Sequence, residues 1–319
     1  MPINGITRQS TLKIIESTIY KPKEFELSYD KLFPIEQFNP IGQAYQYDIL
    51  LKQGTATVTS QPPTSKDTTD QTMSLDSVLF KPFFISTEFN YSDEELDENN
   101  FINANAGAFT RAQINLEFEK ATYGRRLIHE WINSISLKGY APINSNGLFN
   151  HPQITPVAVA EGATGANATA KKKWENKTGL EIQADVLLAY KTARRGGLYN
   201  PRTMAISPST EVTLMKAWSV YDSTPVIEKL KSLIPEIITV PEFEPAYNQI
   251  APTYDTNAGT SIFMVYEKDI QNVSIPQMRD VTVTQERNNK YGSNEFLLTY
   301  KGGSLLARRP QSVHIGRDI

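Results

Sequence analysis

The sequence contains no cysteine among its 319 residues. Disulfides, thiolate-bound zinc and cysteine nucleophiles are therefore excluded. Its three histidines, His129, His151 and His314, lie far apart in the chain and make a poor metal cluster. The glycine-rich loops that bind phosphate or dinucleotides and the nucleophile elbow of the hydrolases are also missing. We therefore expect no catalytic residue, no cofactor and no metal, and predict that the protein is not an enzyme.

The chain also lacks a long apolar run and a large excess of either charge. No stretch of about 18 apolar residues is present, so no membrane span is expected. The first residues show no basic-then-apolar signal pattern. With 32 basic and 35 acidic residues the net charge is −3, whereas proteins that grip nucleic acid usually carry a basic excess. We expect a soluble cytosolic product with no membrane partner and only weak contact with nucleic acid.

Residues 103–137 are predicted to form one long helix. Apolar residues recur there at helical spacing and no proline interrupts the pattern. At ~1.5 Å per residue such a helix would span about 50 Å, which is long for a globular protein. An acidic run over residues 93–98 suits a helix start, and Gly139 is a plausible C-cap. Gly124 inside the pattern is expected to mark a close contact or a bend.

Two extended segments upstream of this helix predict a hairpin arm. Residues 44–59 alternate with a strand period, and residues 73–90 return extended with many aromatic side chains. The segment between them, residues 59–71, is polar and contains two prolines, as expected of a loop tip. An isolated two-stranded hairpin is marginal in water. The arm is therefore covered either by its own domain or by a neighbouring subunit, and the pattern leaves both open.

Residues 141–267 are predicted to form a compact α/β domain, because helix and strand patterns alternate there. Ser207 and Pro208 are typical of an N-cap and first helical residue, and Thr224 with Pro225 repeats that pattern. The expected helices cover residues 180–194, 208–220 and 225–233, and the expected strands cover residues 204–207, 237–240 and 261–266. Residues 162–169 are interpreted as a flexible loop, and the three lysines at 171–173 that follow it are interpreted as solvent-exposed.

The tail, residues 273–319, is strand-like, and Gly302-Gly303 predicts a two-residue hairpin between residues 296–301 and 304–307. Residues 1–35 are interpreted as a peripheral N-terminal arm with a short helix near residues 11–16. The individual residues that stand out are interpreted as structural. Trp131 and Trp218 are placed in the core, His151 in a hydrogen-bonded turn, and Arg308 with Arg309 on the solvated surface.

Directly behind the long helix lies Gly147-Leu148-Phe149-Asn150-His151-Pro152. A long helix followed by such a turn resembles the major capsid proteins of tailed bacteriophages, whose fold encapsulins share. Further short segments resemble the same family in the expected order over residues 40–319: Phe80-Lys81-Pro82, Ile206-Ser207-Pro208, Gly302-Gly303 and Arg309-Pro310.

The resemblance implies an α+β, phage capsid-type fold with a long spine helix, an extended β-hairpin loop, a discontinuous peripheral domain and an α/β axial domain. It implies four regions: an N-terminal arm at 1–35, an extended hairpin loop and return strand at 36–90, a peripheral domain at 91–140 and 268–319, and an axial domain at 141–267. Lys52 and Lys66 are the lysines of the hairpin loop. Since nothing in the sequence selects an asparagine partner for either, crosslinking between subunits is not expected.

The implied function is structural. Subunits would assemble through pentamers and hexamers into an icosahedral shell enclosing double-stranded DNA, in the virion and, during assembly, in the host cytoplasm. The expected partners are other copies of the chain, scaffolding and portal proteins, decoration proteins, and packaged DNA through weak non-specific contact. Two alternatives stay open: an encapsulin-like shell around a cargo enzyme, and a soluble α/β enzyme with an unrecognised site and an arm packed on its own domain.

Overall fold

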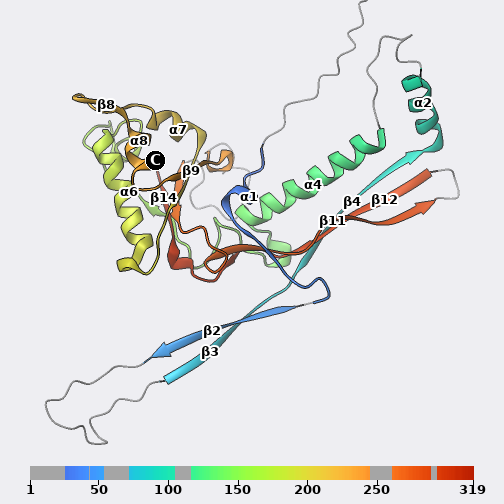
Figure 1. The fold of residues 1–319 in the computed structure, drawn as a ribbon. Helices are drawn as coiled ribbons and strands as arrows, with labels where there is room; N and C mark the ends of the chain where they lie inside the picture. The colour runs from blue at the N-terminus through green and yellow to red at the C-terminus, as the bar shows by residue number, and fades with distance from the viewer. Residues whose placement is uncertain (1–25, 43, 54–71, 105–115, 245–260, 289–292) are drawn as a thin grey trace, which may run out of the picture.

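The computed structural model describes residues 26–42, 44–53, 72–104, 116–244, 261–288 and 293–319 (Figure 1). It contains two five-stranded sheets, a separate hairpin arm and a small second hairpin. The predicted helix at residues 11–16 and the predicted loop tip at 59–71, which includes Lys66, lie outside the described residues. So do residues 105–115, near the start of the predicted long helix.

The arm consists of β2 (Tyr45–Gln53) and β3 (Thr72–Phe80), paired antiparallel from Tyr45 opposite Phe80 to Gln53 opposite Thr72. It stands away from the rest of the chain (Figure 1). The extended segment expected over residues 73–90 is confirmed, but it divides at Lys81-Pro82 into β3 and β4 (Phe83–Ser92). Proline lacks the backbone N–H that a continuous ladder needs. β3 then pairs with β2, whereas β4 joins a different sheet.

That sheet has the strand order β1 (Ile35–Gln37), β11 (Val273–Asn288), β12 (Ser293–Gly302), β4, with β13 (Leu306–Ala307) also paired to β11. The spine helix α4 (Leu116–Lys138) packs along it, and α2 (Asp93–Ala104) follows β4 at its far end (Figure 1). The helix prediction is confirmed for residues 116–137. A Cβ on Gly124 would lie 2.5 Å from Leu298 Cδ1, so this glycine marks a close approach of helix to sheet.

The second sheet has the order β5 (Val157–Ala158), β14 (Val313–Arg317), β10 (Ile262–Tyr266), β6 (Thr203–Ile206), β9 (Glu236–Thr239). Helices α6 (Gly179–Arg194), α7 (Pro208–Leu214) and α8 (Val226–Lys231) cover one face of it. The other face joins the core beneath α4. The α/β alternation and the three expected strands, now β6, β9 and β10, are confirmed. Helix α6 ends at Arg194 as expected, but the left-handed C-cap residue is Arg195 at φ 44°, and Gly196 at φ 70° follows it. The C-terminal strand β14 returns to this sheet.

Two helix ends differ from the expectation. Ser207 caps α7 as predicted, accepting the Thr210 amide, but α7 ends at Leu214 instead of continuing to residue 220. A hairpin of β7 (Ala217–Ser219) and β8 (Asp222–Pro225) follows. Just after this end, the Lys216 ammonium donates to the carbonyl of Trp174 at 2.6 Å and to that of Lys177, which ties the chain to the loop before α6. The next helix, α8, starts one residue later than expected, with Pro225 at the N-cap.

Two loop interpretations were also wrong. Residues 162–172 are ordered by local bonds and include a short helix, α5 (Ala168–Lys172), whose N-cap Asn167 accepts the Ala170 amide at 2.8 Å. Gly302-Gly303 is not a hairpin turn, because β13 pairs with β11 and not with β12. The Gly303 amide donates to the Pro276 carbonyl at 2.9 Å, and a Cβ there would lie 2.6 Å from Pro276 Cγ.

The described end of the expected N-terminal arm lies inside the body. Helix α1 (Tyr29–Leu32) packs on α4, and Leu32 and Phe33 are fully buried in the core that α4 shares with both sheets. Short 3-10 turns complete the described structure: η2 (Ala141–Ile143), η3 (Arg195–Gly197), η4 (Pro241–Phe243) and η5 (Pro310–Ser312).

Candidate assembly surfaces

The root of the arm is packed by aromatic rings. Tyr45 at the start of β2 stacks on Phe80 at the end of β3, with ring centroids 5.4 Å apart and an interplanar angle of 18°. Phe38 meets both rings edge-on, at 5.4 Å and 5.7 Å. Offset and edge-to-face pairs of this kind are favourable beyond the area that they bury. The direction in which the arm leaves the body is therefore set by packed side chains.

Two cations reinforce this root. The Arg308 guanidinium lies 2.8 Å from Glu36 Oε2 and 5.3 Å from the centroid of the Tyr47 ring. Lys301 Nζ donates to the carbonyls of Pro40 at 2.7 Å and Gly42 at 2.6 Å. The sequence analysis placed Arg308 on the solvated surface, and these contacts show that this placement was wrong. The expectation holds better for Arg309, which is exposed and reaches Asn272 Oδ1 only at 3.5 Å.

Beyond the root, the arm has no partner among the described strands. β2 and β3 pair only with each other, so each presents one unpaired strand edge. Apolar side chains on the arm, Met73 and Leu79, are exposed. A two-stranded sheet with open edges and exposed apolar residues is marginal by itself. The arm is therefore a surface that needs a partner.

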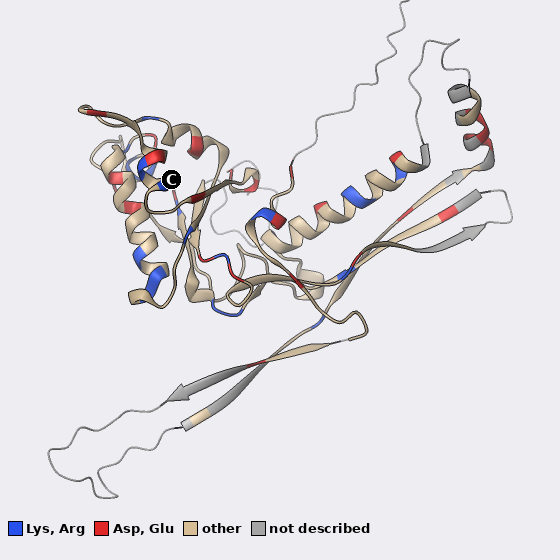
Figure 2. Cartoon of the chain, in the orientation of Figure 1, with Lys and Arg blue, Asp and Glu red and all other residues tan. Residues whose placement is uncertain are grey.

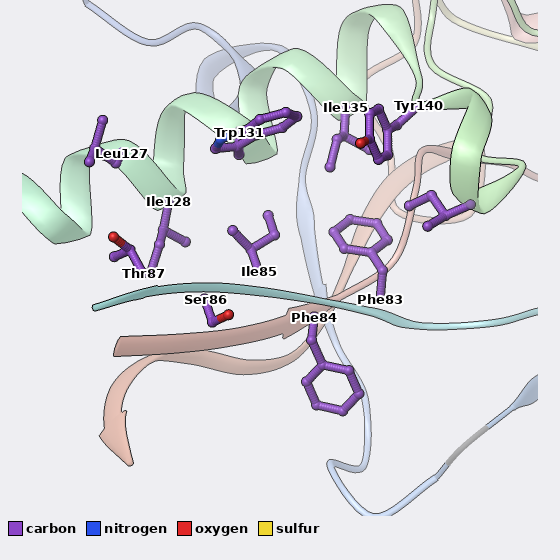
Figure 3. Close-up of a pocket in the computed structure, with 11 residues that line it drawn as sticks. Phe83, Phe84, Ile85, Ser86, Thr87, Leu127, Ile128, Trp131, Ile135 and Tyr140 are labelled. Atoms are coloured by element: carbon purple, nitrogen blue, oxygen red, sulfur yellow. The ribbon is translucent and has the colours of Figure 1, made fainter. Parts of the chain in front are cut away.

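An open apolar groove of about 370 Å³ runs between α4 and β4. Figure 3 shows Ile85, Trp131, Ile135 and Tyr140 facing this space, whereas Phe84 points away from it. Trp131 is 49% exposed, so its placement in the core was wrong. Its ring meets Tyr140 edge-on, with centroids 5.6 Å apart. Half-exposed aromatic rings above an apolar floor are typical of protein contact surfaces.

The opposite side of α4 holds the N-terminal segment through a polar network. Asn133 Oδ1 accepts the Tyr29 amide at 3.1 Å, and Ser28 Oγ donates to Glu242 Oε2 at 2.6 Å. The Tyr29 hydroxyl lies 2.8 Å from His129 Nδ1. Burial raises the pKa of Tyr29 to about 12 and lowers the pKa of His129. The pair is therefore neutral at pH 7 and serves to attach α1 to the spine.

The segment behind the spine closes the end of the helix. The amides of Leu148 and Phe149 donate to the Ser136 and Leu137 carbonyls, each at 2.9 Å, and so satisfy carbonyls of the last turn of α4. Gly139 follows the helix at φ 74°, which confirms it as a C-cap residue. His151 accepts the Gln153 amide at 3.3 Å, and burial lowers its pKa. His151 is thus a turn residue, as predicted.

The remaining predicted positions do not converge. The three histidines lie on separate elements, and no group of His, Asp or Glu in the described residues is arranged to hold a metal ion. Trp218 lies on strand β7 rather than on a helix, packed at the edge of the second core. Lys172 lies 3.7 Å from Asp318, so the basic run is partly paired. Glu95 accepts from the Ser92 amide and the Lys120 ammonium near the start of α2, and the Lys120 bond lowers its pKa.

Sequence reasoning missed a buried cluster below α6. Asp185 Oδ2 accepts from Lys177 Nζ at 2.6 Å and from Trp174 Nε1 at 3.0 Å. Burial raises the pKa of Asp185, and the Lys177 hydrogen bond opposes that rise. One signal was readable: Thr178 and Glu181 form a capping box at the start of α6. The pair of Lys177 and Asp185 fixes the loop before α6, and all its polar partners are inside the chain.

In the described part of the chain, no helix combines the length and apolar character of a membrane span. Basic and acidic residues are scattered along the described chain, with a run of acidic residues on α2 (Figure 2). The features that stand out are therefore surfaces for contact: the arm, the groove beside α4 and exposed apolar helix faces.

Comparisons with known proteins agree with a chain whose prominent features are contact surfaces. A family model described as major capsid protein matches residues 104–316. Among solved structures, the capsid of Myoviridae phage XM1 gives a TM-score of 0.76 at 12% identity, covering 99% of this chain and 100% of that chain. The mature capsid of bacteriophage PhiM1 gives 0.61 at 10% identity, covering 96% of this chain and 91% of that chain.

A virus-like particle from Pyrococcus furiosus gives a TM-score of 0.54 at 14% identity, covering 89% of this chain and 90% of that chain. At these identities the structural likeness shows the fold alone, and it confirms the expected α+β, capsid-type fold. No curated protein matches the sequence.

Proposed function

The chain belongs to the major capsid protein family and is therefore a structural protein that builds a capsid shell, and we propose that it does so through pentamers and hexamers that close around the double-stranded DNA of a tailed phage. The family match spans the spine helix, the α/β sheet and the C-terminal strands. We further propose that the chain has no catalytic activity and that assembly takes place in the host cytoplasm.

One observation supports self-assembly most directly: the arm leaves the body with both strand edges unpaired. Strand β2 pairs with β3 over nine residues, yet neither strand pairs with any other described strand. The root of the arm is held in place by the packed rings of Phe38, Tyr45 and Phe80. A rigid base with an uncovered arm is best explained if the arm lies on the adjacent copy, where its apolar side chains leave water.

The finer assignments form part of this proposal. We divide the chain into an N-terminal arm (1–35), an extended loop (36–90), a peripheral region (91–140 and 268–319) and an axial region (141–267), with β14 completing the axial sheet. Scaffolding, portal and decoration proteins are the expected partners besides other copies of the chain. A net charge of −3 fits a shell that confines DNA by weak, non-specific contact.

Negative-stain electron microscopy and sedimentation of the purified protein test the proposal. Closed shells, or rings of five and six subunits, are the expected result, and nucleic acid inside particles from infected cells would separate a phage shell from a compartment that packages protein. A stable monomer or dimer that never assembles, even with crowding agents, would refute it.

A matched variant tests the role of the arm. In this variant a two-residue Asn-Gly turn replaces residues 46–79 and connects Tyr45 to Phe80. These two residues already face each other across the ladder, so the short turn fits between them. The variant should keep the circular dichroism spectrum of the body and lose closed particles. Normal particles from this variant would show that the arm has no part in shell formation.

A further inference from the structure

Helix α6 is apolar on two opposite faces. Its inward face, Ile182, Val186 and Ala189, is buried against the second sheet. Its outward face carries leucines at helical spacing, with Leu188 58% exposed: Leu180, Leu187 and Leu188. Ala184 continues this stripe and is also exposed. A surface helix normally presents polar residues opposite its buried stripe, whereas α6 presents this apolar stripe there, with polar residues such as Gln183 and Lys191 beside it. The stripe is therefore suited to be covered by another surface.

A second exposed apolar face lies at the other end of the same helical layer. On α7, Val212 is 74% exposed, and Met215 just after the helix is exposed beside it. α6 packs against β14 and β10, towards one edge of the sheet. α7 is tied to the strand at the other edge, because Thr239 of β9 donates to its Glu211 at 2.7 Å. Figure 1 shows α6 and α7 apart in this layer.

The two ends also differ in charge. The last turn of α6 and the residue after it are basic, with Lys191, Arg194 and Arg195 all exposed. The α7 end carries Glu211 on the helix and Glu244 beside its first turn, where Glu244 Oε1 accepts the Ser209 amide at 2.6 Å. Figure 2 shows basic residues at one end of α6 and an acidic residue on α7. Positive charge thus lies at the C-terminal end of the α6 face, whereas two carboxylates lie beside α7.

We propose that the α6 face of one copy packs against the α7 face of the next copy, head to tail, around a ring. This inference rests on the proposed function, since it supplies the contact within a pentamer or hexamer. A parallel contact between two α6 faces would bring the basic ends of two helices together, which is unfavourable, whereas a contact of α6 with α7 can place basic beside acidic groups. Contacts between two different surfaces of the same chain generate closed rings when the rotation closes.

The absence of cysteine makes the contact directly testable. A variant carrying both Leu188→Cys and Val212→Cys is assembled, treated with a flexible bis-maleimide and run on a denaturing gel. The expected result is a ladder of covalent oligomers that stops at pentamer and hexamer. Each single variant, assembled alone, should remain monomeric on the gel. A mixture of the two single variants should give covalent dimers that contain one copy of each.

Other pairs control for position and for folding. Leu188→Cys combined with Thr122→Cys, an exposed position on α4, should give no ladder. Leu187→Cys with Met215→Cys provides a second pair on the same two faces if the first variant fails to fold. Leu188→Lys should leave the circular dichroism spectrum unchanged and reduce sedimenting particles at least tenfold.

The outcomes separate the two proposals. Covalent dimers from Leu188→Cys alone would show that two α6 faces meet and would overturn the head-to-tail contact. Normal particles with no ladder from either pair would also overturn it and leave the proposed function intact. Failure of the unmodified chain to assemble would refute the proposed function, and this inference with it.

Discussion

Three glycines allow the cost of backbone conformation to be separated from the cost of close contact. A Cβ on Gly147 would lie 2.3 Å from the Gly139 amide nitrogen and 2.6 Å from the Leu137 carbonyl carbon, and both are backbone atoms that cannot rotate away. Gly196 has φ 70° with nothing within 4 Å of a Cβ. Gly139 combines both features, with φ 74° and a Cβ 2.4 Å from the Ser145 carbonyl oxygen.

Replacing each glycine with alanine should therefore give graded losses of stability. Gly196→Ala carries only the left-handed penalty, about 1 kcal/mol. Gly147→Ala forces the turn away from the end of α4, which costs about 1–3 kcal/mol for overpacking and roughly 1 kcal/mol more as the Leu148 and Phe149 bonds weaken. Gly139→Ala adds the left-handed penalty to the overpacking cost, so it should lose about 2–4 kcal/mol, similar to Gly147→Ala and more than Gly196→Ala.

Urea unfolding of unassembled subunits, followed by far-ultraviolet circular dichroism, gives the three free energies of unfolding. Gly196→Ala is the control for a general effect of replacing glycine. A Gly147→Ala variant that loses no more stability than Gly196→Ala would refute the reasoning, since it would show that the turn behind the spine yields without cost.

Three further outcomes are expected. Arg308→Met removes the ion pair with Glu36 at the root of the arm and leaves Glu36 only its hydrogen bond from the Ser274 hydroxyl, at a cost of about 1 kcal/mol. Proteolysis within the arm of unassembled subunits should therefore speed up roughly fivefold, whereas the matched control Arg309→Met should change nothing. Burial lowers the pKa of His151 and His314 in the folded state below the value of about 6.5 expected in the unfolded state. The free energy of unfolding is therefore highest above about pH 6.5 and falls as the pH drops towards the pKa values of the folded state, because the unfolded chain then binds protons that the folded chain does not. Urea midpoints should therefore be lower at pH 5.5 than at pH 7.5, by a smaller margin in the variant His151→Asn/His314→Asn, and an equal margin would contradict this. Thr178→Ala breaks the capping box of α6 and should cost about 1 kcal/mol in the same assay, and an unchanged midpoint would show that the cap is dispensable.

The elements that were predictable from sequence are those fixed by local patterns. Helix α6 follows from its 3.6-residue periodicity and its terminal glycines, and Ser207 with Pro208 marks the start of α7. The turn behind the spine was recognised from its residues, and Gly139 ends the helix because it adopts the left-handed conformation that glycine tolerates.

What was not predictable depends on partners far away in the chain. Arg308 looked solvated because its partner Glu36 lies 272 residues earlier. Gly302-Gly303 has the composition of a hairpin turn, but Gly303 is required by the close approach of Pro276. No local pattern distinguishes a glycine that turns the chain from one that admits a neighbour. The exposed faces of Trp131 and α6 were missed for a related reason, since apolar spacing predicts burial but does not tell which molecule provides it.

Strand β10 determines which parts of the subunit can move independently. Its alternate side chains enter different cores: Met264 and Tyr266 face the core beneath α4, whereas Phe263 and Val265 face the core beneath α6. Burying such side chains is worth about 1.5–3 kcal/mol each, so shearing one half against the other would expose both cores. The arm has no such link, because its ladder is interrupted at residues 81–82 and only its root is packed. Among the described segments, the arm beyond its packed root is therefore the part that can bend while both cores stay intact.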